Sequence, residues 1–303
     1  MDQKSFPNQK VVLAGAGGDL GDRIAKALVE RGADVHAIVR SGTSAAKRSM
    51  LSSLGLTVVT VDYNDAASLT QACKGAGCVV SVLNGLEPVI IDAQGQLLDA
   101  AVAAGVPRFI PSDYSLDFTK TRPGDNRNMD LRRTFMQRVD STPIRATSVL
   151  NGAFADLLTG GAPIILRGPK KVLYWGSADQ AFDVTTKDDV ARYTATVALD
   201  EAAPRFLRIA GDVVTPRLLA ATATMLLGKS FGLWRAGGIG RLSALIRVIR
   251  TLTPRSEAPF PAWQGMQYLR DMSSGRGKLE TLDNDRYGKM SWSSAKDVLQ
   301  LVM

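Results

Sequence analysis

The chain has 303 residues, 45% of them hydrophobic and 22% charged, which is enough to bury a full core in one large domain or two unequal ones. Two cysteines and a single histidine exclude a disulfide framework, histidine-based triads and histidine metal sites, so we expect no bound metal. The basic residues behind the net charge of +8 are scattered and are not interleaved with aromatic ones, so we expect no nucleic-acid partner.

A glycine-rich turn lies near the start of the chain, between a predicted strand at residues 11–13 and a predicted helix. The glycines follow the pattern Gly15-x-x-Gly18-x-x-Gly21, and the strand after the helix ends at Arg40. Gly15 lets the chain turn sharply, Gly18 lets backbone N–H groups approach a pyrophosphate, and Gly21 lets the helix pack closely on the sheet. Because the glycines sit inside a βαβ unit of the right length, we favour a dinucleotide site over a purely structural turn.

Arg40 stands where a protein that selects NAD usually carries an acidic residue for the ribose 2′-hydroxyl. A guanidinium there favours a 2′-phosphate, and Ser41 adds a hydroxyl beside it. Thr43, Lys47 and Arg48 follow along the next helix, although Lys47 and Arg48 are equally explained as a solvated basic helix end. We therefore predict NADP(H) as the cofactor.

Short apolar strands and amphipathic helices then alternate as far as residue 150. The patterns predict strands over 57–61, 78–83, 108–110 and 145–150, and helices over 66–73, 89–104 and 128–139. This alternation predicts an α/β fold with a doubly wound parallel sheet, whose ligands bind at the carboxyl ends of the strands. We expect Cys73 and Cys78 to be core or subsurface thiols and His36 to be a packed strand residue.

Polar residues follow the strands at the end where a cofactor binds. Asp62 can accept a hydrogen bond from the adenine amino group, and Asn84-Gly85 lies next to the ribose, although both also suit ordinary turns. We expect segments 111–114 and 151–154 near the nicotinamide. The residues predicted to contact the cofactor are Gly15, Gly18, Asp19, Leu20, Gly21, Arg40, Ser41, Asp62, Tyr63, Leu83, Asn84, Gly85, Pro111, Ser112, Asn151 and Phe154.

The next segments mix short strands with helices. Residues 164–166 and 172–175 flank Gly168-Pro169 as a predicted hairpin. A strand over 182–184 is expected to return to the nucleotide-binding domain, before a helix over 188–199.

A helix over 216–227 is followed by an arginine-bearing helix between Arg235 and Arg255. For the second helix we favour a cover for the core, with its arginines outward, over a membrane-surface or partner-binding helix. An apolar stretch in this region fits a pocket for an apolar ring compound, although core packing explains part of it: Phe231, Leu233, Trp234, Phe260, Trp263, Met266, Tyr268, Leu269 and Met272.

The glycine pattern, the phrase AAVAAGVPRFIPSDYSLDF, the segment NMDLRR and the NGAF at 151–154 resemble one known family. It is the NmrA-like, isoflavone-reductase-like branch of the atypical short-chain dehydrogenases/reductases. The resemblance is strongest over residues 10–155 and looser beyond. It implies a Rossmann domain that binds NADP(H) over residues 1–155, completed by 179–200, and a smaller substrate-binding or lid region over 156–178 and 201–303.

The sequence departs from this family at the catalytic position. The Tyr-x-x-x-Lys pair of short-chain dehydrogenases is absent, and the reductases of this branch use instead a lysine just before an Ile-Arg-Arg-like segment. Aligning Leu131-Arg132-Arg133 with that segment puts Asn128 at the lysine position. An amide can hydrogen-bond a nicotinamide or a substrate carbonyl, but it supplies no ammonium proton. Our candidate catalytic residues are Asn128 and Tyr114.

Two functions fit these features. We predict an NADPH-dependent reductase that passes hydride to a small apolar, electron-poor acceptor, namely a quinone, enone, imine or carbonyl. The alternative is a catalytically silent NADP(H) sensor of the NmrA type that acts through a protein partner. The absent lysine favours the sensor, and the apolar C-terminal region favours the enzyme. No apolar run reaches the roughly 18 residues of a membrane span and the start lacks a signal peptide's apolar stretch, so we expect a cytoplasmic monomer or homodimer.

Overall fold

The structure, a computed structural model, describes residues 9–253 and 258–302 of the chain. The chain divides into two compact units, each built from segments that lie far apart in the sequence. Unit 1 comprises Met1–Asp113, Leu131–Val149 and Val190–Leu207, and unit 2 comprises Tyr114–Asp130, Leu150–Asp189 and Arg208–Met303.

Unit 1 is built on a six-stranded sheet in the order β3-β2-β1-β4-β5-β6. The strands are β1 (Lys10–Ala14), β2 (Asp34–Arg40), β3 (Thr57–Val61), β4 (Cys78–Ser81), β5 (Arg108–Ile110) and β6 (Arg145–Ala146). Every neighbouring pair runs parallel. This is the predicted doubly wound α/β fold, and the strand order reverses between β1 and β4.

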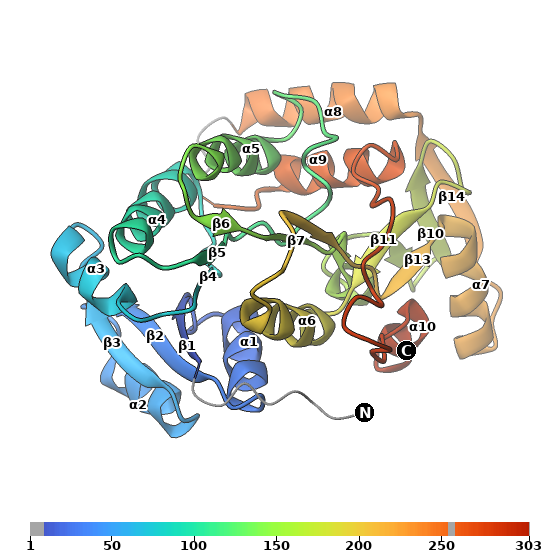
Figure 1. The fold of residues 1–303 in the computed structure, drawn as a ribbon. Helices are drawn as coiled ribbons and strands as arrows, with labels where there is room; N and C mark the ends of the chain where they lie inside the picture. The colour runs from blue at the N-terminus through green and yellow to red at the C-terminus, as the bar shows by residue number, and fades with distance from the viewer. Residues whose placement is uncertain (1–8, 254–257, 303) are drawn as a thin grey trace. The chain divides into compact units, whose positions relative to one another are not determined.

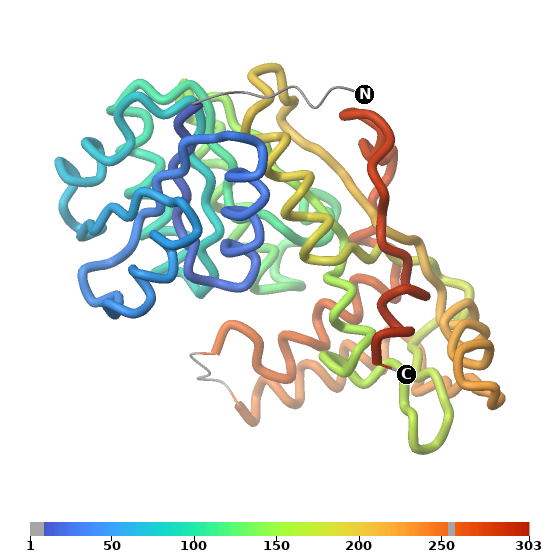
Figure 2. The backbone as a smooth tube through the Cα atoms, turned by 90° about the horizontal axis from the view of Figure 1, so that it is seen from below, coloured from blue at the N-terminus to red at the C-terminus, as the bar shows by residue number. Residues whose placement is uncertain are grey.

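Helices cover both faces of this sheet, with α1, α2 and α6 on one face and α3, α4 and α5 on the other (Figure 1). The first set lies nearest the viewer when the chain is seen from below (Figure 2). Helices α5 and α6 begin in unit 2 and continue into unit 1. The helices are α1 (Asp19–Val29), α2 (Ala45–Ser53), α3 (Ala66–Cys73), α4 (Gln94–Ala103), α5 (Arg127–Asp140) and α6 (Lys187–Leu199).

The central strands are buried on both faces, which explains their continuous apolar sequence. Cys73 and Cys78 are both buried, as predicted, and burial raises the pKa of each thiol to about 11. Neither thiol is therefore a nucleophile at neutral pH. His36 is half-buried, with its Nε2 atom 3.0 Å from a carboxylate oxygen of Asp34.

Arg108 at the start of β5 is 1% exposed, which is unusual for a charged side chain. Its guanidinium donates hydrogen bonds to the carbonyl oxygens of Val197 and Ala198, at 2.8 and 3.1 Å, and to the Thr147 hydroxyl at 3.4 Å. These two carbonyls belong to the last turn of α6, where backbone acceptors have no partner within the helix. The buried charge thus satisfies the negative end of a helix dipole.

Over its first 150 residues the structure differs from the predicted elements at three places. Strand β4 ends at Ser81 rather than residue 83, and the helix predicted over 89–104 opens with a π-helical segment, η1 (Pro88–Ala93), before α4. The single strand predicted over 145–150 is interrupted at Thr147, because β6 pairs with β5 whereas β7 (Ser148–Leu150) pairs with β12 (Phe206–Arg208).

Unit 2 contains two three-stranded sheets, in the orders β14-β10-β9 and β13-β11-β8. The hairpin predicted across Gly168-Pro169 forms as β9 and β10. The strand predicted over 182–184 forms as β11, but it pairs with β13 and β8 rather than with the six-stranded sheet. The strands are β8 (Ala153–Phe154), β9 (Ile165–Leu166), β10 (Lys171–Trp175), β11 (Phe182–Thr185), β13 (Asp212–Val214) and β14 (Gly232–Gly237).

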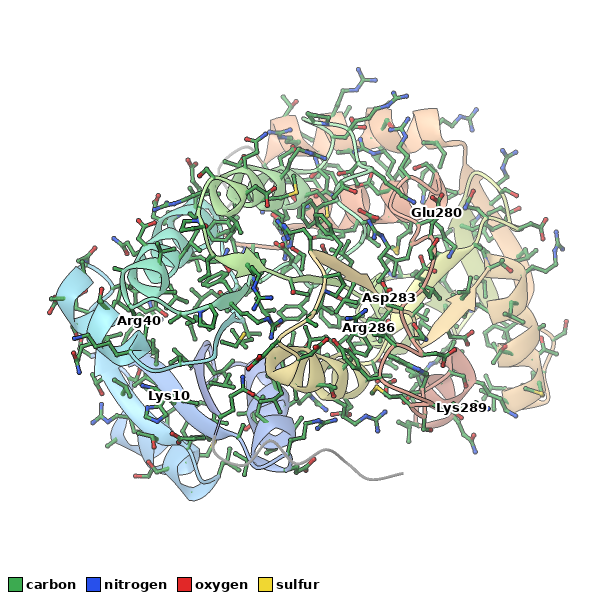
Figure 3. All side chains as sticks on the ribbon, in the orientation of Figure 1. Lys10, Arg40, Glu280, Asp283, Arg286 and Lys289 are labelled. Carbon is green, nitrogen blue, oxygen red and sulfur yellow. The ribbon has the colours of Figure 1, made fainter. Side chains whose placement is uncertain are left out.

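The helices of unit 2 are the 3₁₀ segment η2 (Ala155–Thr159), α7 (Pro216–Leu227), α8 (Ile239–Leu252), α9 (Ala262–Ser273) and α10 (Ala295–Gln300). Helix α7 begins and ends where predicted, with Pro216 in its first turn and Gly228 left-handed at φ 61° after it. The segment that precedes α10 is bonded to other parts of unit 2. Glu280 forms an ion pair with Lys120 at 2.8 Å, and the Asp283 carboxylate accepts a hydrogen bond from the Arg208 N–H at 2.8 Å; Glu280 and Asp283 are labelled in Figure 3.

We expect Arg108→Met to lower the free energy of unfolding by about 2 to 4 kcal/mol, because the buried carbonyl of Ala198 loses its Arg108 donor and that of Val197 keeps only the Asp200 N–H, at 3.2 Å. Urea-induced unfolding followed by circular dichroism measures this loss. Arg145→Met is the matched control, since exposed Arg145 also donates to one carbonyl, that of Glu201, at 2.8 Å. We expect about 0.5 kcal/mol or less for the control. Equal losses in the two variants would contradict the role of Arg108.

Candidate functional site

The turn between β1 and α1 leaves no room for side chains at two of its glycines. Gly15 has φ +93°, and a Cβ atom on it would lie 2.7 Å from the carbonyl oxygen of Val82, just beyond β4. A Cβ atom on Gly21 would lie 2.1 Å from the carbonyl oxygen of Gly15. Both contacts are shorter than carbon and oxygen tolerate, so these glycines are required by the fold itself.

Gly18 differs from the other two glycines because it faces open space. Its N–H donates to the Gly15 carbonyl at 3.0 Å, its backbone is extended, and a Cβ atom would meet only that carbonyl at 3.5 Å. Among the described residues, no side chain caps the start of α1 at Gly18. The first-turn N–H groups therefore remain available to an anion at the positive end of the helix. Asp19 in that turn is paired with Arg23 at 2.8 Å.

Arg40 ends β2 with an exposed side chain, at the edge of the sheet opposite Lys10, which begins β1 (Figure 3). Within residues 9–253 and 258–302, the Arg40 guanidinium forms no hydrogen bond or ion pair with another side chain or carbonyl. It lies close enough to Tyr63 to act on it electrostatically: burial raises the pKa of Tyr63 to about 12, and Arg40 opposes that rise. Arg40 and Tyr63 thus lie together at the carboxyl ends of β2 and β3.

Lys47 and Arg48 are the two residues of this site that the sequence left undecided. A Cβ atom on Gly17 would lie 3.0 Å from the Lys47 Cε atom, so the lysine side chain covers the glycine turn. Arg48 instead donates to the carbonyl oxygen of Thr43 and closes the loop before α2. The proximity of Lys47 to the turn depends on the loop between β2 and α2, which sequence spacing does not specify.

Three predicted cofactor residues also serve the local structure. Asp62 is exposed and accepts from the Asn64 N–H at 2.9 Å, which is the turn role considered as its alternative. Gly85 has no room for a side chain, because a Cβ atom would lie 2.5 Å from Val89. Ser112 after β5 donates its N–H to the Gln94 side chain at 2.9 Å. Asn84 is exposed.

Asp113, after Ser112, belongs to a buried polar group that the sequence did not predict. It accepts from the Ser148 hydroxyl at 2.7 Å, and Arg205 donates to that hydroxyl at 2.8 Å. Burial raises the pKa of Asp113, opposed by the Ser148 hydrogen bond and then by Arg132 and Arg205. The group joins the ends of β5 and β7, which lie far apart in the sequence.

Asn151 is fully buried in unit 2 with an unusual side chain. Its N–H donates to the Ser115 carbonyl at 3.0 Å, and its carbonyl accepts from the Thr185 hydroxyl at 2.7 Å. Neither the nitrogen nor the oxygen of its side-chain amide has a hydrogen-bond partner among the described residues. A buried amide without partners is costly, and such groups in native proteins usually have an external partner. Phe154, in β8, is half-buried.

Asn128 lies in the first turn of α5 and is buried. Its amide nitrogen donates to the Pro259 carbonyl at 3.1 Å, and its amide oxygen accepts from Arg127 Nε at 3.2 Å. Arg127 in turn lies over the Trp263 ring, 4.6 Å from its centroid. Asn128 is thus joined to the segment that precedes α9. Tyr114, the other catalytic candidate, is also buried.

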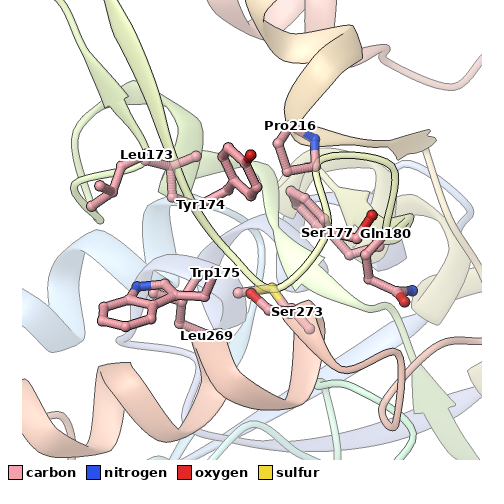
Figure 4. Close-up of a pocket in the computed structure, with 11 residues that line it drawn as sticks. Leu173, Tyr174, Trp175, Ser177, Gln180, Pro216, Leu269 and Ser273 are labelled. Atoms are coloured by element: carbon pink, nitrogen blue, oxygen red, sulfur yellow. The ribbon is translucent and has the colours of Figure 1, made fainter. Parts of the chain in front are cut away.

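Unit 2 contains a pocket whose walls are mostly apolar and aromatic (Figure 4). Leu269 and Met272 come from the predicted apolar stretch, whereas Trp263 packs under Arg127 and Phe260 is exposed. Strand β10 supplies three lining residues, Leu173, Tyr174 and Trp175. The sequence predicted this segment as a hairpin strand but not as part of a pocket. The lining residues are Ile164, Leu173, Tyr174, Trp175, Ser177, Gln180, Phe182, Pro216, Leu269, Met272 and Ser273.

The predicted site residues fall in both units. Unit 1 holds fourteen of the predicted cofactor residues, from Gly15 to Ser112, and unit 2 holds Asn151, Phe154, Asn128 and Tyr114. Contact of both sets with one cofactor stays a prediction. Among the residues that the structure describes, none gather as a histidine, cysteine or carboxylate cluster fit for a metal. In the same ranges, no helix has the length and apolar character needed to cross a membrane.

The reversal of strand order between β1 and β4, together with the glycine turn beside it, defines an α/β protein of the dinucleotide-binding class. The chain belongs to the NmrA-like family, whose model matches residues 7–232. The family resemblance proposed from the sequence is thereby confirmed.

Proteins similar to this chain are named as reductases. Bifunctional pinoresinol-lariciresinol reductase 1 of Linum usitatissimum is 28% identical over 237 residues, which is 73% of this chain and 75% of that protein. Isoflavone reductase homolog IRL of Zea mays is 31% identical over 209 residues, 64% of this chain and 65% of that protein. The solved structure of AtPrR2 with NADP+ and (+)pinoresinol shares the fold, with a TM-score of 0.82 at 20% identity over 98% of this chain and 99% of that chain.

We expect Gly18→Val to weaken NADPH binding at least tenfold while the protein stays folded. The substitution places a branched side chain where the turn must meet a pyrophosphate, but it meets no protein atom closer than 3.5 Å. The lost N-cap glycine costs about 1 kcal/mol of stability. Fluorescence titration with NADPH and thermal unfolding measure the two effects. Unchanged affinity in a folded variant would remove the turn from the site.

Proposed function

We propose that this protein is an NADPH-dependent reductase that transfers hydride to a small, apolar, electron-poor acceptor, namely a quinone, enone, imine or carbonyl. One observation carries the proposal: Arg40, whose guanidinium bonds to no described residue, and the open glycine turn at Gly18 lie at the same edge of one parallel sheet. Membership of the NmrA-like family supports it, as do relatives named as reductases.

The residues of unit 1 fit NADP(H). The open backbone at Gly18 suits the pyrophosphate. Arg40 with Lys47 suits a 2′-phosphate, since Lys47 covers the turn and Arg40 ends β2 at the same edge of the sheet. Tyr63 beside Arg40 offers an apolar surface to the adenosine. The other predicted contacts, from Asp19 to Phe154, belong to the same proposal.

When bound, NADPH supplies the hydride, so the protein itself has to orient the acceptor and provide a proton. Tyr114 is our candidate proton donor, with a substrate group or water as the other sources. Asn128 carries no transferable proton, and we assign it an orienting role through its amide. The unpartnered amide of buried Asn151 is a second candidate for hydrogen bonding to the nicotinamide or the acceptor.

The acceptor belongs to the C-terminal part of the chain in this proposal. We assign nucleotide binding to residues 1–155 with 179–200, and substrate binding to 156–178 and 201–303. The apolar and aromatic walls of the unit 2 pocket suit a ring-containing compound, with Gln180 and two serines as polar contacts. We place the protein in the cytoplasm as a monomer or homodimer.

A redox sensor is the second candidate. It is favoured by the amide at position 128, which is already bonded to Pro259 and Arg127 and offers no ammonium. In that function NADP(H) occupancy would be passed to a protein partner without turnover.

NADPH oxidation against a panel of quinones, enones, imines and aldehydes decides between the two functions when it is run beside a calorimetric titration of the cofactor. Turnover of any acceptor supports the reductase. Tight binding without turnover across the panel would support the sensor.

We expect Arg40→Asp to weaken NADPH binding by about 2 to 4 kcal/mol, because a charge-assisted hydrogen bond is replaced by repulsion of the 2′-phosphate. NADH binding should change far less, since it lacks that phosphate. Lys74→Asp, an equal charge change at an exposed site elsewhere in unit 1, is the control. Calorimetry with both cofactors measures the difference, and equal losses for NADPH and NADH would refute the assignment.

Asn128→Ala should lower turnover about 10- to 100-fold if Asn128 orients the cofactor or acceptor. The change also removes the bond to Pro259, so thermal unfolding must be measured alongside. Asn128→Lys restores an ammonium and should speed reduction of carbonyl acceptors. Wild-type turnover in a stable Asn128→Ala protein would exclude Asn128 from catalysis and leave Tyr114 as the candidate. For a sensor, both variants should change nucleotide affinity alone.

A further inference from the structure

The longest stretch of the chain without an acidic residue runs from 213 to 256, between Asp212 and Glu257. It holds seven basic residues, which nearly equal the net charge of +8 of the whole chain: Arg217, Lys229, Arg235, Arg241, Arg247, Arg250 and Arg255. Arg255 lies outside the described residues. A basic excess this concentrated attracts anionic surfaces.

Helix α8 within this stretch has an apolar face that none of the described residues covers. Leu242 and Ile246 are buried against unit 2, but Leu245, Val248 and Leu252 are 40%, 56% and 75% exposed. The spacing i, i+3 and i+7 puts these three on one side of the helix. From Leu245 to Leu252, α8 thus carries an exposed apolar stripe about 10 Å long.

Basic side chains border this stripe. Arg241 lies one turn before Leu245 on the same side, and Arg247 is exposed next to Val248. Neither guanidinium has an ion pair or hydrogen bond among the described residues. Arg250 points elsewhere, since it lies 5.3 Å from the Trp263 ring centroid.

An exposed aromatic residue, Phe260, follows α8 in the sequence. Phe260 is 56% exposed and lies 6.0 Å from Tyr268 of α9, centroid to centroid. Helix α9 packs along α8 in unit 2 (Figure 1). An exposed apolar stripe bordered by arginines is typical of helices that lie in a membrane interface.

We propose that the stripe of Leu245, Val248 and Leu252, with Arg241 and Arg247, docks on an anionic phospholipid surface. The aliphatic side chains enter the headgroup boundary, while the arginines extend along it to the lipid phosphates. Charge complementarity selects this occupant. A second copy of the chain would bring two sets of unpaired arginines together, and a nucleic acid offers phosphates but no apolar phase for the exposed leucines.

The full chain should be tested by flotation with vesicles of phosphatidylcholine alone and with one quarter phosphatidylglycerol. We expect binding to the anionic vesicles at 0.1 M salt, at least tenfold weaker binding at 0.5 M salt, and little binding to neutral vesicles. No flotation with anionic vesicles, or equal flotation with both kinds, would overturn the proposal.

Two double variants separate charge from apolar insertion. Arg241→Glu with Arg247→Glu should weaken flotation at least tenfold, and Val248→Ser with Leu252→Ser at least fivefold. The matched controls are Arg122→Glu with Arg167→Glu, and Leu218→Ser with Met225→Ser on α7, all at exposed positions of unit 2. Both controls should float like the wild type, and all variants should bind NADPH unchanged. Equal losses in variant and control would overturn the proposal.

Two further results would overturn it by identifying another occupant. One is dimerisation, measured by light scattering, that the serine variant abolishes. The other is binding of a DNA oligonucleotide that needs the two arginines but not Val248 and Leu252.

Discussion

The close approach of helix α1 to the turn before it is the constraint on which the candidate site depends. A side chain at Gly21 would strike the Gly15 carbonyl, and one at Gly15 would strike the carbonyl of Val82 beyond β4. The turn is therefore pressed between the helix and the point where the strand order reverses. This contact brings the positive end of α1 to the edge of the sheet where β2 ends at Arg40. Backbone N–H groups and a guanidinium therefore lie at the same edge, and no described side chain caps the helix.

Arginine illustrates how surroundings decide the use of one residue type. Arg108 is buried and satisfies carbonyls at the end of α6, so it belongs to the framework of the fold. Arg127 lies over Trp263 and bonds the segment before α9. Arg40 and Arg241 are exposed, and their guanidinium groups form no hydrogen bond or ion pair with any described residue, which leaves both able to pair with an external anion. The sequence shows the same letter at all four positions, and only burial and neighbours separate them.

The sequence predicts that this chain departs at position 128 from the reductases that it resembles. The Asn128 amide is hydrogen-bonded to the Pro259 carbonyl and to Arg127, so its position is fixed. It supplies no proton, unlike the ammonium of a lysine. Reduction by such a site depends on positioning the acceptor and on a proton from another source. The buried, unpartnered amide of Asn151 shows that polar groups are kept in unit 2 at a cost to stability, as expected where a ligand completes their bonds.

The sequence by itself determined the parallel sheet, through its local apolar spacing, and the limits of helices α3 and α7, through their capping residues. It also determined the glycine turn, which depends on backbone freedom, and the position of Arg40 at the end of a strand. Only the tertiary structure placed Lys47 over the turn, split β6 from β7 at Thr147 and moved β11 to another sheet. It also joined Asp113, Ser148 and Arg205 in one buried group. These features depend on which distant segments pair and how loops fold back, and local pattern carries no information on partners that lie many residues away.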